Sequence, residues 1–206
     1  MGTGSGFIYK IAPEITVSLV GGANKTYDST ATASLTSGNY ALSGVLDGDT
    51  ISISGQGEYN DKHSGSGKQV TVNNLTIDNA TNGSSAVYGY RLANTSATGS
   101  IGVIEQAVLS AHLAGTAVKV YDGTTHAILG DSNYLLSGII GSDEVKLNNH
   151  ISGSYDTKHA GTGKTVTVDG LTISGADGGN YRLQASQLSA GIGVIDQAEL
   201  SAALIG

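Results

Sequence analysis

Apolar and polar residues alternate along this chain in short segments, which are separated by residues typical of turns. In residues 15–19, for example, Ile, Val and Leu alternate with Thr and Ser. Alternation with a period of two places the apolar side chains on one face of an extended strand. Similar segments lie at residues 51–54, 70–72, 75–77, 101–104, 109–113, 145–148, 166–168, 171–173, 192–195 and 200–204. The pattern therefore predicts many short strands, each with one buried face.

The second half of the chain repeats the first. Residues 59–72, YNDKHSGSGKQVTV, recur at residues 155–168 as YDTKHAGTGKTVTV. Self-similarity at a long period indicates tandem domains, and 206 residues suffice for two domains of roughly 90 to 95 residues each. We predict domains at residues 11–105 and 106–196. Residues 1–10 are expected to be a cloning scar, and residues 197–206 the start of a further repeat or an end strand.

The composition favours an all-β fold and argues against several classes of protein. The chain has 31 glycines without a three-residue period and one proline, which is typical of a turn-rich β protein. The net charge of -7 argues against nucleic acid as a partner, because its binding depends on clustered Lys and Arg. Without cysteine the chain forms no disulfide, and no apolar run is long enough to cross a bilayer.

Two kinds of turn are predicted within each copy. Asp122-Gly123 is a turn signal, but Ser29 replaces the glycine in the first copy, so we predict that a positive φ is not required there. Residues 73–74 and 169–170 separate short strands and predict tight hairpins. The junction between the copies contains only Glu105 and Gln106 and lacks a flexible Gly/Ser tract, which favours a stiff connection.

Three motifs together carry a family resemblance. They are Lys-x-Tyr-Asp-Gly at residues 119–123, Gly-x-Gly-Lys before Val-Thr-Val at residues 161–168, and GADGGNYRL at residues 175–183 before an Ile-Gly-Val-Ile strand. In this combination the chain resembles, twice over, the YDG repeat domain of large exported bacterial adhesins of the filamentous-haemagglutinin type. It departs from that pattern at Ser29, and at His63 and His159, where the family leads us to expect Asn. With the short junction, the resemblance implies two tandem Ig-like β-sandwich domains arranged end to end as a rod.

The resemblance also implies a function. Our hypothesis is a non-enzymatic structural stalk of a secreted or cell-surface bacterial protein associated with the outer membrane. Such a stalk would be a monomer that contacts neighbouring repeats of the same chain and carries a distant tip for carbohydrate, matrix or a host surface. The alternative is a module whose own loops, such as residues 79–90, bind carbohydrate or a host protein. Neither nucleic acid nor membrane insertion is expected.

A stalk that transmits force would gain strength from a covalent cross-link inside each domain, because noncovalent stability is only about 5 to 15 kcal/mol. A buried lysine of depressed pKa can form such a bond with Asn or Asp. The candidate residues present in both copies are Asp28, His63 and Lys68 in the first and Asp122, His159 and Lys164 in the second, together with Lys25, Lys119, Asp49 and Asp143. We predict the pairs Asp28 with His63 and Asp122 with His159. The alternative is turn capping and ordinary salt bridges.

No catalytic or cofactor site is predicted. Both copies lack a shared nucleophile, base and orienting group, which a secreted hydrolase would need. The Gly-x-Gly-Lys motif precedes a strand instead of a helix and lacks the spacing of a phosphate-binding loop. Oxygen-rich turns could hold Ca²⁺, although none follows the spacing of a known calcium loop and solvated turns are the favoured interpretation. The acidic residues of these turns are Asp47, Asp49, Asp143, Glu144 and Asp177.

Overall fold

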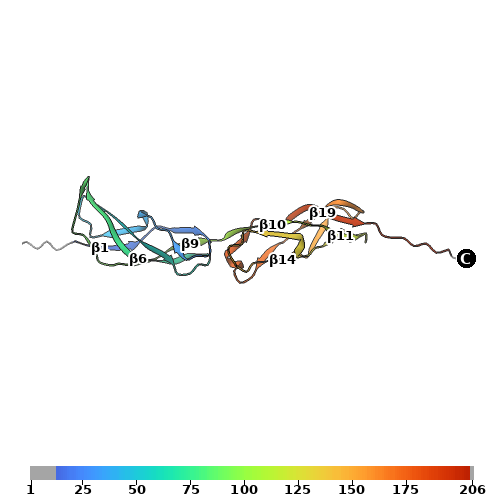
Figure 1. Cartoon of the computed structure of the whole chain (residues 1–206), viewed down its shortest axis with the longest axis horizontal. Helices are drawn as coiled ribbons and strands as arrows, with labels where there is room; N and C mark the ends of the chain where they lie inside the picture. Colours follow the sequence, from blue (N-terminus) through green and yellow to red (C-terminus); the bar gives the residue numbers. More distant parts are fainter. Residues whose placement is uncertain (1–12, 205–206) are drawn as a thin grey trace, which may run out of the picture. The chain divides into compact units, whose positions relative to one another are not determined.

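The computed structural model describes residues 13–204, so the segment interpreted as a cloning scar lies outside the described residues. The chain divides into two compact units between Glu105 and Gln106. Strands form nearly all of the regular structure in the described residues, and the helices there are short 3-10 turns (Figure 1). None of these helices is long and apolar enough to cross a membrane. The all-β prediction is therefore confirmed.

Unit 1 contains two sheets. The larger sheet has the order β2 (Ala23–Thr26), β9 (Ala97–Glu105), β6 (Gly65–Asn82), β5 (Asp49–Tyr59) and β3 (Thr32–Ala33), and β7 (Ser85–Ala86) pairs with β6. The smaller sheet has the order β4 (Tyr40–Ser43), β1 (Glu14–Leu19) and β8 (Arg91–Leu92). A 3-10 turn, η1 (Ser37–Asn39), precedes β4. The first strands of the unit are thus divided between its two sheets.

Unit 2 repeats this arrangement, except that two of its strands form a third sheet of their own. Its larger sheet has the order β11 (Ala117–Val120), β19 (Leu188–Asp196), β16 (Gly161–Val168), β15 (Ser152–Tyr155) and β12 (His126–Ile128). The second sheet has the order β13 (Tyr134–Ser137), β10 (Ala107–Leu113) and β18 (Tyr181–Leu183). The third is the pair β14 (Lys146–Asn148) and β17 (Thr172–Ser174), and the 3-10 turns are η2 (Asp131–Asn133) and η3 (Gly178–Asn180).

Alternate residues of the strands form the core of each unit. Along β1, Ile15, Val17 and Leu19 are buried while their neighbours are exposed, as the alternation predicts. In both units the hydroxyl of a buried tyrosine donates a hydrogen bond to a backbone carbonyl. The hydroxyl of Tyr59 donates a hydrogen bond to the carbonyl of Ala23 at 2.9 Å. In unit 2, the hydroxyl of Tyr155 donates to the carbonyl of Ala117 at 3.0 Å.

The first strand of each larger sheet pairs in parallel with the last strand of the same unit. In unit 1 the register of β2 and β9 begins with Ala23 opposite Gly102 and ends with Thr26 opposite Glu105. One residue later, the N–H of Tyr27 donates to the carbonyl of Glu105 at 2.8 Å. Strands β11 and β19 repeat this register from Ala117 opposite Gly193 to Val120 opposite Asp196. The chain therefore enters and leaves each larger sheet on adjacent strands that run in the same direction.

The turns predicted at residues 73–74 and 169–170 are not hairpins. In unit 1, β6 continues through Asn74, whose φ is 53°, and its register with β5 shifts there as in a β-bulge. In unit 2 the equivalent residues separate β16 from β17, which pair with different strands. The hairpin closes instead across residues 60–64, where Tyr59 lies opposite Val70. The buried Val72 and Leu75 lie on either side of Asn74, where this bulge occurs in β6.

The strand predicted at residues 200–204 does not form in the described chain. Leu200 and Leu204 are almost fully exposed, although the similar segment in β10 buries Leu109 and Ala111. A strand needs neighbours that accept its backbone hydrogen bonds, and β10 has them on both sides in β13 and β18. No described strand pairs with residues 200–204. The alternating pattern is therefore present there without the partners that would make it a strand.

Candidate functional site

A lysine, an aspartate and a threonine form the same turn after β2 and after β11. In unit 1, Nζ of Lys25 donates to Oδ1 of Asp28 at 2.7 Å and to the carbonyl of Thr30 at 2.7 Å. The backbone N–H of Thr30 donates to the same carboxylate oxygen at 2.9 Å. The ammonium group also lies 5.4 Å from the ring centroid of Tyr59, in cation–π contact. The Tyr-Asp motif is thus part of a closed polar turn against the core tyrosine.

Unit 2 reproduces this turn with nearly identical distances. Nζ of Lys119 lies 2.7 Å from Oδ1 of Asp122 and 5.5 Å from the ring centroid of Tyr155. The residue after the aspartate has a positive φ in both units, 66° at Ser29 and 79° at Gly123. The prediction that no positive φ is needed there is wrong, because the turn that lets Asp28 and Asp122 accept their hydrogen bonds requires it. Ser29 adopts this conformation although L-residues with a Cβ disfavour it.

Replacing Ser29 with Gly is therefore expected to stabilise unit 1, by up to about 1 kcal/mol, because glycine reaches positive φ without steric cost. The gain is partly offset by the larger conformational entropy of glycine in the unfolded chain. The reciprocal change, Gly123→Ser, should destabilise unit 2 by a similar amount. Chemical denaturation of the two variants measures both effects. If both variants were as stable as the parent, the turn would have no steric preference for glycine at this position.

The carboxylates of these turns link stability to pH. Hydrogen bonds from Lys119 and then from Thr124 lower the pKa of Asp122 well below its usual value. Burial alone would raise the pKa of Asp28, but hydrogen bonds from Lys25 and Thr30 lower it overall. A carboxyl of lowered folded-state pKa contributes stability that is fully present above its unfolded-state pKa, about 3.9. That contribution is lost as the pH falls through the lower folded-state value.

We therefore expect the melting temperature to fall steeply as the pH is lowered from 5 through about 4 and below. The variant Asp122→Asn should be less stable than the parent at pH 7 and should lose less stability on acidification. Thermal melts over this pH range provide the measurement. A variant whose acid limb is as steep as that of the parent would contradict the assignment to Asp122.

The residues predicted to form a cross-link in unit 1 contact several other groups. Asp28 is bound to Lys25, as described above, and the exposed His63 donates its backbone N–H to Oδ1 of Asp61 at 2.8 Å. Lys68 is buried, with 8% exposure, and its Nζ lies 2.5 Å from the same oxygen of Asp61. Local turn geometry thus provides Asp28 with a partner only three residues away. The buried lysine instead meets an aspartate outside the predicted set.

Unit 2 keeps a buried lysine beside a carboxylate although the aspartate has moved. Lys164, the equivalent of Lys68, is 9% exposed and lies 3.2 Å from Oδ1 of Asp156 and 2.5 Å from Oγ1 of Thr157. The threonine occupies the position of Asp61, and the aspartate precedes it by one residue. His159 is exposed and lines a shallow surface pocket with Tyr121. A buried lysine held by a carboxylate is therefore a shared feature of both units.

Three of the acidic residues considered for Ca²⁺ accept hydrogen bonds from protein groups. The hydroxyl of Tyr90 lies 2.5 Å from Oδ2 of Asp49, and that of Tyr181 lies 2.6 Å from Oδ2 of Asp143. Asp177 accepts a hydrogen bond from the backbone N–H of Glu144 at 2.9 Å. Within residues 13–204 no cluster of three or more His, Cys, Asp or Glu side chains could hold a metal ion. Through its hydroxyl, each tyrosine links the start of β8 or β18 to Asp49 or Asp143, a contact that we call the tyrosine latch.

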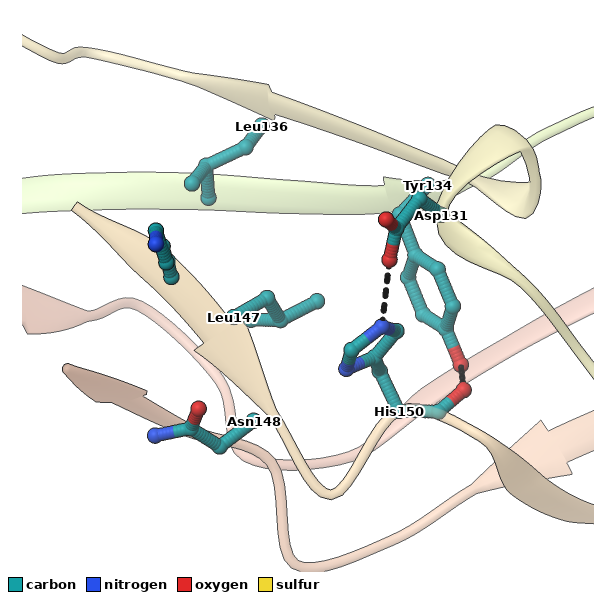
Figure 2. Close-up of a pocket in the computed structure, with 7 residues that line it drawn as sticks. Asp131, Tyr134, Leu136, Leu147, Asn148 and His150 are labelled. Atoms are coloured by element: carbon teal, nitrogen blue, oxygen red, sulfur yellow. Dashed lines mark hydrogen bonds and ion pairs between the residues drawn. The ribbon is translucent and has the colours of Figure 1, made fainter. Parts of the chain in front are cut away.

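Sequence reasoning missed a pocket of about 490 Å³ in unit 2, between β13 and β14. Nε2 of His150 lies 2.6 Å from Oδ1 of Asp131, and the hydroxyl of Tyr134 donates to the carbonyl of His150 at 2.7 Å (Figure 2). Leu136 and Leu147 lie on facing strands beside this cluster. The signal available in the sequence was the two-residue insertion in the second copy, which contains His150.

No curated protein and no solved structure matches the chain. The YDG domain model matches it twice, at residues 11–97 and 105–189, and so covers most of its length. Each match contains one Lys–Asp–Thr turn, one buried lysine and one tyrosine latch. The chain therefore belongs to the YDG domain family, of which it contains two tandem copies.

Proposed function

We propose that the two YDG units are load-bearing spacers in the stalk of a large exported bacterial adhesin. The observation that carries this proposal is the parallel pairing of β2 with β9 and of β11 with β19. Tension along the chain reaches β2 and β11 through the preceding β1 and β10, and it pulls them in the direction opposite to the ends of β9 and β19. Because the two strands are parallel and adjacent, their hydrogen bonds are loaded in shear, all at once. Antiparallel neighbours joined by a hairpin would instead separate one bond at a time.

The proposal includes an Ig-like sandwich in each unit and an end-to-end arrangement as a rod, on a secreted or surface-bound monomer. The division of the strands of each unit into separate sheets and the lack of a Gly/Ser tract at the junction support it. Small-angle scattering on the two-unit chain tests the arrangement, since a rod has a maximum dimension near twice that of one unit. Pulling single molecules from both termini tests the load-bearing role. We expect two unfolding events, both at high and similar force. Unfolding without resolvable force peaks would refute the load-bearing role.

We propose a cross-link between Lys68 and Asp61 and between Lys164 and Asp156. These two lysines are the only buried lysines of the described chain. After proton transfer within the ion pair, the neutral amine of the lysine could attack Cγ of the carboxylic acid, forming an amide and releasing one water. Each bond would lower the intact mass by one water. A mass equal to that of the sequence would leave both pairs as salt bridges.

A further inference from the structure

The polar rim of the pocket between β13 and β14 is unique to unit 2. Up to the two-residue insertion in unit 2, equivalent residues of the two units are separated by a constant number of positions. In this alignment Asp131, Lys146 and Asn148 replace Ser37, Ser52 and Ser54 of unit 1. The floor is shared, since Tyr134, Leu136 and Leu147 correspond to Tyr40, Leu42 and Ile53. Unit 1 builds equivalent strands without the larger polar side chains, so the fold does not require them.

The insertion of Asn149 and His150 positions an imidazole at one end of this pocket. Asn149 has a φ of 58°, which turns the chain after β14. Nε2 of His150 lies 2.6 Å from a carboxylate oxygen of the exposed Asp131, and its ring contacts that of Tyr134 edge to face at 5.5 Å. Nδ1 of His150 is buried and has no hydrogen-bond partner among the described residues. A buried polar atom without a partner costs free energy, so stability alone does not account for this histidine.

The remaining polar groups of the rim are complementary to a hydroxylated anion. Lys146 is exposed and forms no ion pair with any residue of the described chain. Oδ1 of Asn148 accepts a hydrogen bond from Ser174 at 3.1 Å, which leaves the amide N–H groups of Asn148 as donors. Oδ2 of Asp131 remains an acceptor for a ligand hydroxyl. The apolar side chains of Leu136 and Leu147 also line the pocket (Figure 2).

We propose that this pocket binds one acidic sugar residue of a polysaccharide or glycoconjugate. The sugar carboxylate would pair with the ammonium group of Lys146, a charge-assisted contact stronger than a neutral hydrogen bond. The C–H groups of the ring would pack on Leu136 and Leu147, and its hydroxyls would bond to Asn148 and Asp131. A volume of about 490 Å³ lies within the range of about 300 to 1,000 Å³ typical of small-molecule sites. The proposal is independent of load bearing, because an empty pocket would leave the unfolding force unchanged.

The test is a titration of the two-unit chain with three probes, followed by two-dimensional NMR of the backbone amides. The probes are methyl glucuronide, the methyl glycoside of sialic acid and the neutral methyl glucoside. We expect saturable shifts confined to residues 131–150 with at least one acidic probe, at a dissociation constant of about 1 mM, the weak end of the affinity scale. Glucuronide binding indicates a uronate polysaccharide as the source, and sialoside binding indicates a sialylated surface.

Two variants identify the groups that bind. Lys146→Gln should weaken binding of the acidic probe about tenfold or more, because it removes a hydrogen bond to a charged group. Deletion of Asn149 and His150 should abolish the shifts, and amide spectra of both variants report whether the fold is retained. Lys158→Gln, an exposed lysine outside the pocket, is the matched control and should bind like the parent. Equal shifts with the neutral glucoside, no saturable shift with any probe, or unchanged affinity in Lys146→Gln would overturn the proposal.

Discussion

Replacing Asn133 with Ala is expected to lower the free energy of unfolding of unit 2 by about 3 kcal/mol. Asn133 is buried, and its side chain satisfies three backbone groups. Oδ1 accepts from the N–H of Gly130 at 3.0 Å, and Nδ2 donates to the carbonyls of Ala114 and Thr116, each at 3.3 Å. Without the amide these groups lose their partners, at about 1 to 3 kcal/mol for each that stays buried. For a unit of this size the melting temperature should fall on the order of 15 °C.

The same arrangement in unit 1 provides a replicate. Oδ1 of Asn39 accepts from the N–H of Thr36 at 2.9 Å, and Nδ2 donates to the carbonyls of Val20 and Gly22. Hydrogen exchange resolved by peptide assigns each loss of stability to its unit, so Asn133→Ala should spare unit 1 and Asn39→Ala should spare unit 2.

The variant Asn133→Asp separates hydrogen bonding from side-chain volume. It keeps the size and the acceptor of asparagine but places a carboxylate against the carbonyls of Ala114 and Thr116. We expect it to destabilise unit 2 at least as much as Asn133→Ala does. If Asn133→Asp leaves the free energy of unfolding unchanged and Asn133→Ala lowers it by less than about 1 kcal/mol, the three backbone groups bond to water instead.

These asparagines illustrate what the sequence alone could reveal about the fold. Alternation identified most strands, because it depends only on which face of a strand is buried. The alternation contains no information on which strands pair. It therefore could not show that Asn74 and its neighbours belong to a bulged strand instead of the predicted hairpin. Asn39 and Asn133 recurred in the repeat, but recurrence alone does not distinguish a buried amide that joins two loops from a solvated one.

The candidate sites were predictable to different degrees for a similar reason. Repetition identifies Asp28 and Lys68 as residues that both copies share, but their partners depend on distances that only the folded chain defines. Lys25 reaches Asp28 because a positive φ at Ser29 closes the turn, and the sequence pointed away from that conformation. The repeat does not predict the pocket around His150, because this residue lies in an insertion that only the second copy has.

Replacing Tyr121 with Pro is expected to lower the force at which unit 2 unfolds, while unit 1 of the same molecule keeps its force. The N–H of Tyr121 donates to the carbonyl of Asp196 at 2.8 Å, at the end of the parallel pairing of β11 with β19. Proline has no N–H and removes this bond, yet its φ of about −65° is compatible with an extended chain. If the row of bonds is loaded together in shear, loss of its last member exposes the rest to stepwise rupture.

The matched control is Val120→Pro. Successive N–H groups of a strand point to opposite sides, so that of Val120 points away from β19, and β11 is the edge of its sheet. Tyr121→Ala controls for loss of the ring. In single-molecule pulling, each unit of roughly 90 residues releases on the order of 300 Å of chain, so both events can be counted in every trace. Equal reductions of force in Tyr121→Pro and Val120→Pro would mean that the strand end, and not the shared row of hydrogen bonds, sets the mechanical strength.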